Sequence, residues 1–151
     1  MPESVQLTET LARGPSWSLA RGRSNTGDPV LVRTILDPRG LQRSRARAAK
    51  EREVTDGLDV DGVLVPLGVL DAPEGAQVIL PDPGGSPISK LGPLSSDLSR
   101  FLDLAVSLAS TLAAVHRSGL VLRVLDPGLI LADEHGVHWT GLDRASSRTV
   151  A

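Results

Sequence analysis

The sequence predicts an α+β domain in which antiparallel strands and one helix are followed by a longer helix and short hairpins. Short β-branched runs separated by turn residues occupy much of the first half of the chain. Two long stretches free of helix breakers favour helices. A segment with two prolines and two glycines, residues 81–85, separates the two parts because it can continue neither a strand nor a helix.

In the first part, a turn signal precedes each of the best strand candidates. Gly14, Pro15 and Ser16 separate the first two runs, and a turn at residues 25–29 precedes a β-branched run that is short enough for a buried strand. A stretch with many helix formers then follows. Strands are therefore expected over residues 5–14, 16–24, 30–35, 63–69 and 77–80, and a helix over residues 41–55.

The second part contains the clearest helix of the chain. Ser95 or Ser96 is the expected N-cap, and Gly119 is expected to follow the last turn. The apolar residues between them have the three-and-four spacing of one buried stripe. They are Leu98, Phe101, Leu102, Ala105, Leu108, Ala109, Leu112 and Val115. Short strands are expected afterwards over residues 120–125, 129–132 and 137–140.

The composition excludes several kinds of site. The chain of 151 residues has no cysteine, which excludes a disulfide scaffold, thiolate zinc ligation and cysteine nucleophiles. Aromatic residues make up 2% of the chain, too few for the stacking platforms of single-strand nucleic-acid binders. The three histidines, His116, His135 and His138, have no carboxylates at metal-ligand spacing, so no metal site is expected.

Basic residues concentrate in the first predicted helix. Six basic residues and one acidic residue lie between Arg39 and Arg52, although the net charge of the chain is −2. Such a run is most often a solvated helix face. The acidic pI and the shortage of aromatic residues argue against a nucleic-acid surface. A protein partner that contacts this face, or a surface near Trp17, stays open as an alternative.

Neither a membrane span nor a signal peptide is predicted. No uninterrupted apolar run reaches the roughly 18 residues that a membrane span needs. The N-terminus is polar and acidic, whereas a signal peptide begins with a basic flank and an apolar run. A cytoplasmic location is the expectation that follows.

Several short motifs follow one another along nearly the whole chain, from Leu7 to Ser146. They are Pro29-Val30-Leu31-Val32-Arg33, residues 57–63, residues 78–85, residues 112–120, Asp126-Pro127 with Ile130-Leu131, and residues 142–146. Their order resembles the first half of the eukaryotic-type protein kinase fold. The resemblance is nearest to the N-terminal kinase-like domains of bacterial multi-sensor signalling ATPases and hybrid histidine kinases. It implies a small lobe over residues 1–80, a hinge over 81–93, and a partial large lobe over 94–151 that is truncated after the Asp-Phe-Gly region.

The resemblance also implies where a nucleotide cleft would lie. The glycine-rich loop of the family keeps one of its three glycines, Gly14, and Trp17 would oppose the close backbone approach that glycines allow. The strand lysine of the family is Arg33, whose planar fork does not replace a compact ammonium. The helix glutamate is Glu51, so an Arg33–Glu51 ion pair is expected. The vestigial cleft would comprise Gly14, Arg33, Glu51, Leu80 and Asp82.

Three positions that carry the chemistry of the family are degenerate. Val124 replaces the proton-accepting aspartate, Leu129 the magnesium-binding asparagine, and Gly141 the aspartate of the Asp-Phe-Gly motif. Each replacement removes an oxygen that charge stabilisation needs, so no catalytic residue is expected. Asp126 and Asp143 each follow a lost carboxylate by two residues and are the candidates for a relocated one. If neither residue is a relocated catalytic carboxylate, Asp126 is expected to begin a turn and Asp143 to cap the end of a strand.

The sequence therefore predicts a catalytically inactive, pseudokinase-type module with a regulatory or scaffolding role in bacterial signalling. No cofactor is expected beyond weak ATP binding, because Pro81 and Pro83 remove hinge amides. The expected partner is another signalling protein or a further domain of the same chain. Two alternatives stay open: an atypical ATP-binding serine/threonine protein kinase with relocated carboxylates, and a pure protein-interaction domain.

Overall fold

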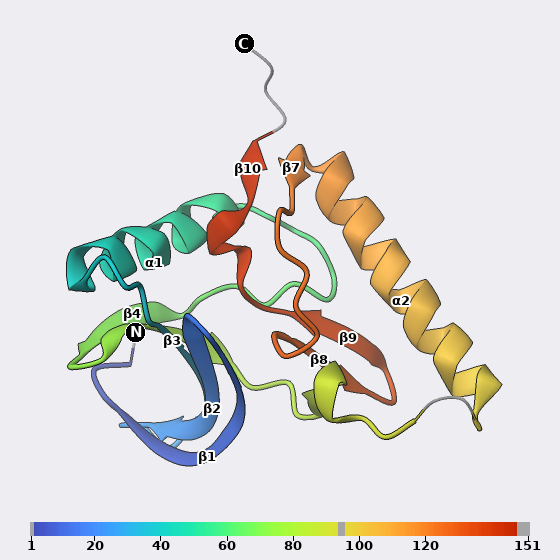
Figure 1. Ribbon diagram of the computed structural model, residues 1–151, viewed down its shortest axis with the longest axis horizontal. Coiled ribbons are helices and arrows are strands. Elements are labelled where there is room, and N and C mark those ends of the chain that lie inside the picture. The colour runs from blue at the N-terminus through green and yellow to red at the C-terminus, as the bar shows by residue number, and fades with distance from the viewer. Residues whose placement is uncertain (1, 94–95, 148–151) are drawn as a thin grey trace.

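The computed structural model describes residues 2–93 and 96–147, and its first half is built around one antiparallel sheet (Figure 1). The five strands lie in the order β1-β2-β3-β5-β4. The central strand β3 is almost entirely buried because sheet neighbours flank it on both sides. The strands are β1 (Val5–Gly14), β2 (Trp17–Ser24), β3 (Pro29–Ile35), β4 (Gly68–Ala72) and β5 (Gly75–Pro81).

Helix α1 (Leu41–Thr55) packs against this sheet and contacts β3, β4 and β5. Its buried residues are Ser44, Ala48, Glu51 and Thr55, which follow the three-and-four spacing of one helix face. The Ser44 hydroxyl donates a hydrogen bond to the Ile35 carbonyl and accepts one from the Ala76 N–H at 2.8 Å. One polar side chain therefore fixes the position of α1 on the sheet.

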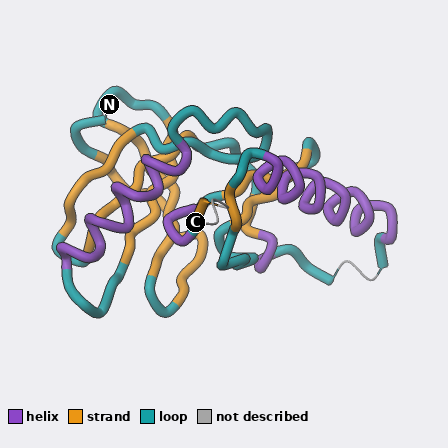
Figure 2. The backbone as a smooth tube through the Cα atoms, turned by 90° about the horizontal axis from the view of Figure 1, so that it is seen from above, coloured by secondary structure: helices purple, strands orange, loops and turns teal. Residues whose placement is uncertain are grey.

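The second half consists of one long helix and short strands. Helix α2 (Leu98–Arg117) contacts β9 and β7, and Figure 2 shows it at the end of the molecule away from the five-stranded sheet. Strands β6, β8 and β9 form a three-stranded sheet, and β10 pairs with β7. The remaining elements are β6 (Ser86–Pro87), η1 (Ile88–Lys90), β7 (Leu120–Val121), β8 (Ile130–Asp133), β9 (Gly136–Trp139), η2 (Leu142–Arg144) and β10 (Ser146–Ser147).

One hydrophobic cluster joins the two halves. Leu129 and Leu131, from the second half, pack into the same buried cluster as residues of β1, β2, β3 and β5. A second cluster lies beneath α2 and contains Leu104, Trp139 and Leu142. The architecture is α+β, with an antiparallel sheet of five strands plus helices, which is consistent with a kinase small lobe.

Two predicted strands differ from the observed ones. The strand predicted over residues 63–69 begins only at Gly68, because Pro66 lacks the N–H that a ladder needs. Val63 instead forms an isolated bridge with Trp139. The strand predicted over residues 120–125 is shorter in the structure: β7 ends at Val121, and its two residues pair with Ser146 and Ser147 of β10.

The prediction for α2 was wrong in two respects. Its N-cap is Asp97, whose carboxylate accepts a hydrogen bond from the Arg100 N–H at 3.0 Å; Ser95 lies outside the described residues. The predicted apolar stripe is not buried as a whole, because Leu98, Phe101 and Leu102 are exposed. The buried residues of the helix are Leu104, Thr111 and Val115, of which Val115 belongs to the predicted stripe; Leu108 and Leu112 of the stripe are partly buried against the same cluster. The position of Gly119 was predicted correctly, since it follows the last turn with φ +96°.

Helix α2 is long and apolar enough to cross a membrane by length and composition alone. It has 20 residues and a mean hydropathy of 1.5 over its most apolar window, of which 17% is buried within the molecule. The hydropathy of α2 therefore does not support the prediction that the chain contains no membrane span. One face of α2 packs on β9, so the helix is part of the folded domain.

Candidate functional site

The cation at the strand-lysine position of the kinase resemblance is completely buried and bound by the protein itself. Arg33 lies in the middle of β3 and is 1% exposed. One terminal nitrogen of its guanidinium donates to Glu51 of α1, which confirms the predicted ion pair. The other donates to Asp143 of η2 at 3.0 Å. A second carboxylate, which the sequence did not predict, therefore completes the neutralisation of Arg33.

Glu51 also fixes the backbone at the degenerate Asp-Phe-Gly position. Its second carboxylate oxygen accepts hydrogen bonds from the backbone N–H groups of Gly141 and Leu142, at 3.2 and 3.3 Å. Burial raises the pKa of the Glu51 carboxyl above its usual value, while the charge of Arg33 and the two backbone hydrogen bonds oppose this shift. Glu51 thus holds α1, β3 and η2 together.

Asp143 was predicted to cap a strand or to serve as a relocated catalytic carboxylate, and the structure gives it a different role. It lies in η2 and is 6% exposed. One of its oxygens accepts from Arg33, and the other accepts from Arg47 Nε at 2.8 Å. Arg47 is four residues before Glu51 and therefore lies on the same side of α1. This spacing was the signal in the sequence that could have indicated that Arg47 joins the network around Arg33.

A side chain at position 141 would crowd Leu129 and the arginine network. Gly141 has φ +82°, a left-handed conformation that favours glycine. A Cβ at this position would lie 2.9 Å from a methyl group of Leu129 and 3.2 Å from a terminal nitrogen of Arg33. An aspartate at this position would therefore need a strained left-handed backbone and shifts of Leu129 and Arg33.

The indole of Trp17 fills the space beneath the predicted phosphate loop. A Cβ on Gly14 would overlap the indole nitrogen, and a Cβ on Gly128 would lie 2.6 Å from the far ring edge. The ring thus lies between Gly14 of the loop and Gly128 of the segment that follows Val124. Trp17 is 8% exposed, so the indole itself is packed inside the molecule and a partner surface near it stays a prediction.

Hydrophobic side chains next to Trp17 also fill the space between the two halves of the chain. Leu129, at the position of the magnesium-binding asparagine, packs in the same cluster as Trp17. Leu80, a predicted cleft residue, has no exposed surface and belongs to that cluster as well. Val124, at the position of the catalytic base, is instead on the surface.

A small cavity remains beside the arginine network. It has a volume of about 170 Å³, which is below the roughly 300 Å³ at which pockets for small molecules begin. Arg33, Arg47, Asp126 and Asp143 contribute to its lining. The two arginines already bind Asp143, and no metal-ligating side chain stands at position 141. The residues present therefore do not fit a magnesium–nucleotide complex.

The two other predicted acidic residues have local structural roles. Asp82 forms an ion pair with Arg21 of β2, with 2.7 Å between Oδ2 and Nε, and accepts a hydrogen bond from the Gly84 N–H at 2.8 Å. Asp126 accepts a hydrogen bond from the Gly128 N–H at 2.9 Å, as expected for a residue that begins a turn. Neither carboxylate is directed to the Arg33 network by a hydrogen bond.

Three of the six basic residues between Arg39 and Arg52 are paired with carboxylates within the molecule. Arg45 pairs with Asp71 of β4 at 2.8 Å, and Arg47 pairs with Asp143. Arg39, just before the helix, pairs with Asp37 at 3.0 Å. The run is therefore only partly the free solvated face that its composition suggested.

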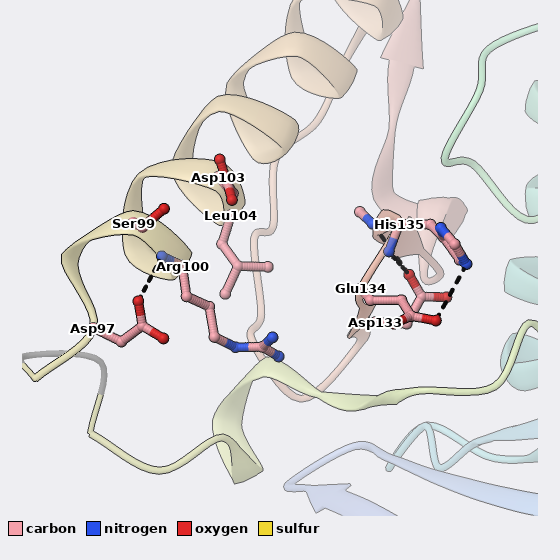
Figure 3. A pocket seen from close by; sticks show the side chains of 9 residues that line it. Asp97, Ser99, Arg100, Asp103, Leu104, Asp133, Glu134 and His135 are labelled. Carbon is pink, nitrogen blue, oxygen red and sulfur yellow. Dashed lines mark hydrogen bonds and ion pairs between the residues drawn. The ribbon is translucent and has the colours of Figure 1, made fainter.

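The largest cavity lies elsewhere, between the start of α2 and the β8–β9 turn (Figure 3). It has a volume of about 490 Å³, and Asp97, Asp103 and Glu134 contribute to its lining. Asp133, which also lines this cavity, pairs with His138 at 3.2 Å. Among the side chains that the structure describes, no group of three or more histidine, aspartate or glutamate residues is placed to hold a metal ion.

Comparison with known proteins extends the kinase resemblance. No family model matches the sequence. The chain is 34% identical over 137 residues to the DNA damage-responsive serine/threonine-protein kinase RqkA of Deinococcus radiodurans. The match covers 87% of this chain but 20% of that kinase, so the chain spans about a fifth of the length of the curated relative. The similarity supports a kinase-like domain.

Proposed function

We propose that this chain is a pseudokinase-type regulatory or scaffolding module in bacterial signalling and that it transfers no phosphate. The observation that carries the proposal is the neutralised arginine network. In an active kinase, the strand cation holds nucleotide phosphates. Here Arg33 is buried between two carboxylates of its own chain, and Trp17 fills the space under the loop.

The network favours a structural role for Arg33 and Glu51, in which they stabilise the fold and do not bind a nucleotide. Releasing Arg33 to bind phosphate would leave Glu51 and Asp143 without their shared buried partner, which is strongly unfavourable in a buried environment. A nucleotide would therefore have to compensate for this loss before it gained any affinity. The proposal accordingly includes no cofactor, a location in the cytoplasm, and a signalling protein or a further domain as the partner.

A thermal unfolding experiment tests the absence of nucleotide binding. The protein is heated with 1 mM ATP, with and without Mg²⁺ or Mn²⁺, and no change in Tm is expected. A nucleotide bound with a Kd of about 10 μM would add about 2.7 kcal/mol of stability. For a protein of this size, that corresponds to an increase in Tm of roughly 5–10 °C.

A metal-dependent increase of that size would contradict the proposal and favour the atypical serine/threonine kinase. The kinase to which the chain is similar gives that alternative its support. Asp126→Asn and Asp143→Asn would then show which carboxylate is needed, with transfer of labelled phosphate to a generic protein substrate as the readout. Loss of transfer in Asp126→Asn alone would assign the relocated base to Asp126.

The second alternative, a pure protein-interaction domain, now depends on few residues. Trp17 is buried, and Arg45 and Arg47 are paired within the molecule. Arg43, Lys50 and Arg52 are the exposed cations of α1 that form no ion pair among the described residues. Replacing all three with glutamate would abolish partner capture if this face were the binding surface, whereas a regulatory module that uses another surface would keep its partner.

A further inference from the structure

The outer face of α2 is apolar and exposed. Leu98 is 67% exposed and Val106 is 65% exposed, while Phe101 and Leu102 are about half exposed. Ala105 and Ala109 continue the same face and are also exposed. Large exposed apolar patches on soluble proteins usually mark interaction sites.

This face points away from the rest of the domain. The buried residues Leu104, Thr111 and Val115 lie on the opposite side of the helix, toward β9. Figures 1 and 2 both place α2 at the edge of the molecule, with none of the described elements over its outer side. A partner helix could therefore approach α2 without meeting the five-stranded sheet.

We propose that this face binds the α2 helix of a second copy of the chain in an antiparallel, two-fold symmetric pair. Side-chain size favours that partner. The N-terminal half of the face carries Leu98, Phe101 and Leu102, whereas its C-terminal half carries Ala109 and Ala113. An antiparallel pair places the large residues of each copy against the small residues of the other, which allows close helix packing.

Charge favours the same orientation. Asp97 is the N-cap of α2, and Arg117 is its last residue. Both are exposed, and neither takes part in an ion pair among the described residues. Asp97 also lines the cavity between α2 and the β8–β9 turn, so its carboxylate is not part of the outer face. The antiparallel pair is favoured by the helix ends themselves, because each N-terminus lies beside the C-terminus of its partner, the favourable arrangement of two helix dipoles.

The available area suits a modest dimer. A helix of 20 residues is about 30 Å long. With a contact strip of about 18 Å around the helix surface, each copy would bury roughly 500–600 Å². The total of about 1,100 Å² lies at the lower end of specific interfaces. The dimer is therefore expected at tens of micromolar protein.

Sedimentation velocity provides the first test. The unmodified chain is expected to be a dimer at 50 μM. Ala109→Glu places a carboxylate near the symmetry axis, beside its own counterpart, and should raise the dissociation constant at least tenfold. Ala46→Glu makes the same substitution at an exposed alanine of α1 and should leave the dimer intact. Both variants should keep the far-UV circular dichroism spectrum of the parent.

Disulfide trapping tests the orientation, because the chain has no cysteine of its own. Leu98→Cys and His116→Cys are prepared separately. In the antiparallel pair, residue 98 lies opposite residue 116 and about 27 Å along the axis from its own counterpart. A mixture of the two variants should therefore form a mixed disulfide, while neither variant alone should crosslink.

Several outcomes would overturn the proposal. One is a monomer at 50 μM that binds phosphatidylcholine vesicles, which would assign the apolar face to a lipid surface. A monomer that binds no vesicles would exclude both partners. Crosslinking of either single variant with itself would indicate a parallel pair. A dimer unaffected by Ala109→Glu would place the interface elsewhere. None of these results depends on nucleotide binding, so they leave the proposed function untouched.

Discussion

Replacing Arg33 with methionine should destabilise the protein more than any other change to a single charged residue of the sheet. Methionine removes the one cation that Glu51 and Asp143 share, and all three side chains are buried, with exposed fractions of 1%, 0% and 6%. Removing one partner of a buried ion pair typically costs about 3–5 kcal/mol, since the remaining charge is left without compensation. Asp143 keeps Arg47, so most of the loss falls on Glu51.

Urea unfolding followed by circular dichroism measures this effect. For a slope of about 2 kcal/mol per molar urea, the expected loss lowers the unfolding midpoint by roughly 2 M. Arg45→Met is the matched control, because Arg45 forms an ion pair with Asp71 in which both side chains are about half exposed. Exposed pairs of this kind contribute about 0–1 kcal/mol.

Arg33→Lys keeps the measurement informative if the methionine variant does not fold. Its single ammonium cannot reproduce two terminal nitrogens that donate to different carboxylates, so a smaller loss of about 1–3 kcal/mol is expected. A double-mutant cycle with Glu51→Gln should show a coupling free energy of at least about 1 kcal/mol. The reasoning is refuted if Arg33→Met unfolds within about 1 kcal/mol of Arg45→Met.

Three further predictions concern other parts of the fold. Trp17→Ala should lower the free energy of unfolding by about 3–5 kcal/mol, because it leaves a cavity between Gly14 and Gly128; Trp17→Phe should cost less, and thermal unfolding compares the two. Ser44→Ala should cost about 1–3 kcal/mol, as it leaves a buried backbone N–H of β5 without its acceptor; a urea midpoint unchanged from the parent would contradict this. Asp37→Asn tests an acid-dependent contribution. The side-chain hydrogen bond from Arg39 holds the pKa of Asp37 well below its usual range, so the contribution is present above about pH 4 and is lost as the pH falls through the lowered pKa. The gap in urea midpoint between parent and variant should therefore be largest at pH 7 and should shrink between pH 4 and pH 2.

The elements of the first half could be predicted from the sequence because local signals and tertiary packing agree there. Helix α1 has the predicted bounds, 41–55, and the strand predicted over residues 30–35 is β3 with one additional residue. Residues 63–67 do not form the predicted strand, because Pro66 lies within the hydrophobic run and lacks the N–H that a strand ladder needs. The exposed stripe of α2 could not be predicted, since apolar periodicity identifies a face that favours burial but does not show whether anything covers it.

The candidate site was predictable only in part. The Arg33–Glu51 pair followed from the positions of the two residues in the kinase resemblance. The second carboxylate did not, because Asp143 is 110 residues from Arg33 and only the path of the chain through η2 brings it close. The inward position of Trp17 likewise depends on glycines at two distant places, Gly14 and Gly128, which leave room for the indole.

The crowding around Gly141 limits which residues the chain can accept at position 141. An aspartate placed there would have to adopt a left-handed backbone, move Leu129, and bring a third carboxylate to an arginine that already binds two. An aspartate at position 141 would therefore reduce the stability of the fold. Substitutions of Leu129 and Asp143 made at the same time would relieve part of that crowding, so the residues at positions 129, 141 and 143 depend on one another.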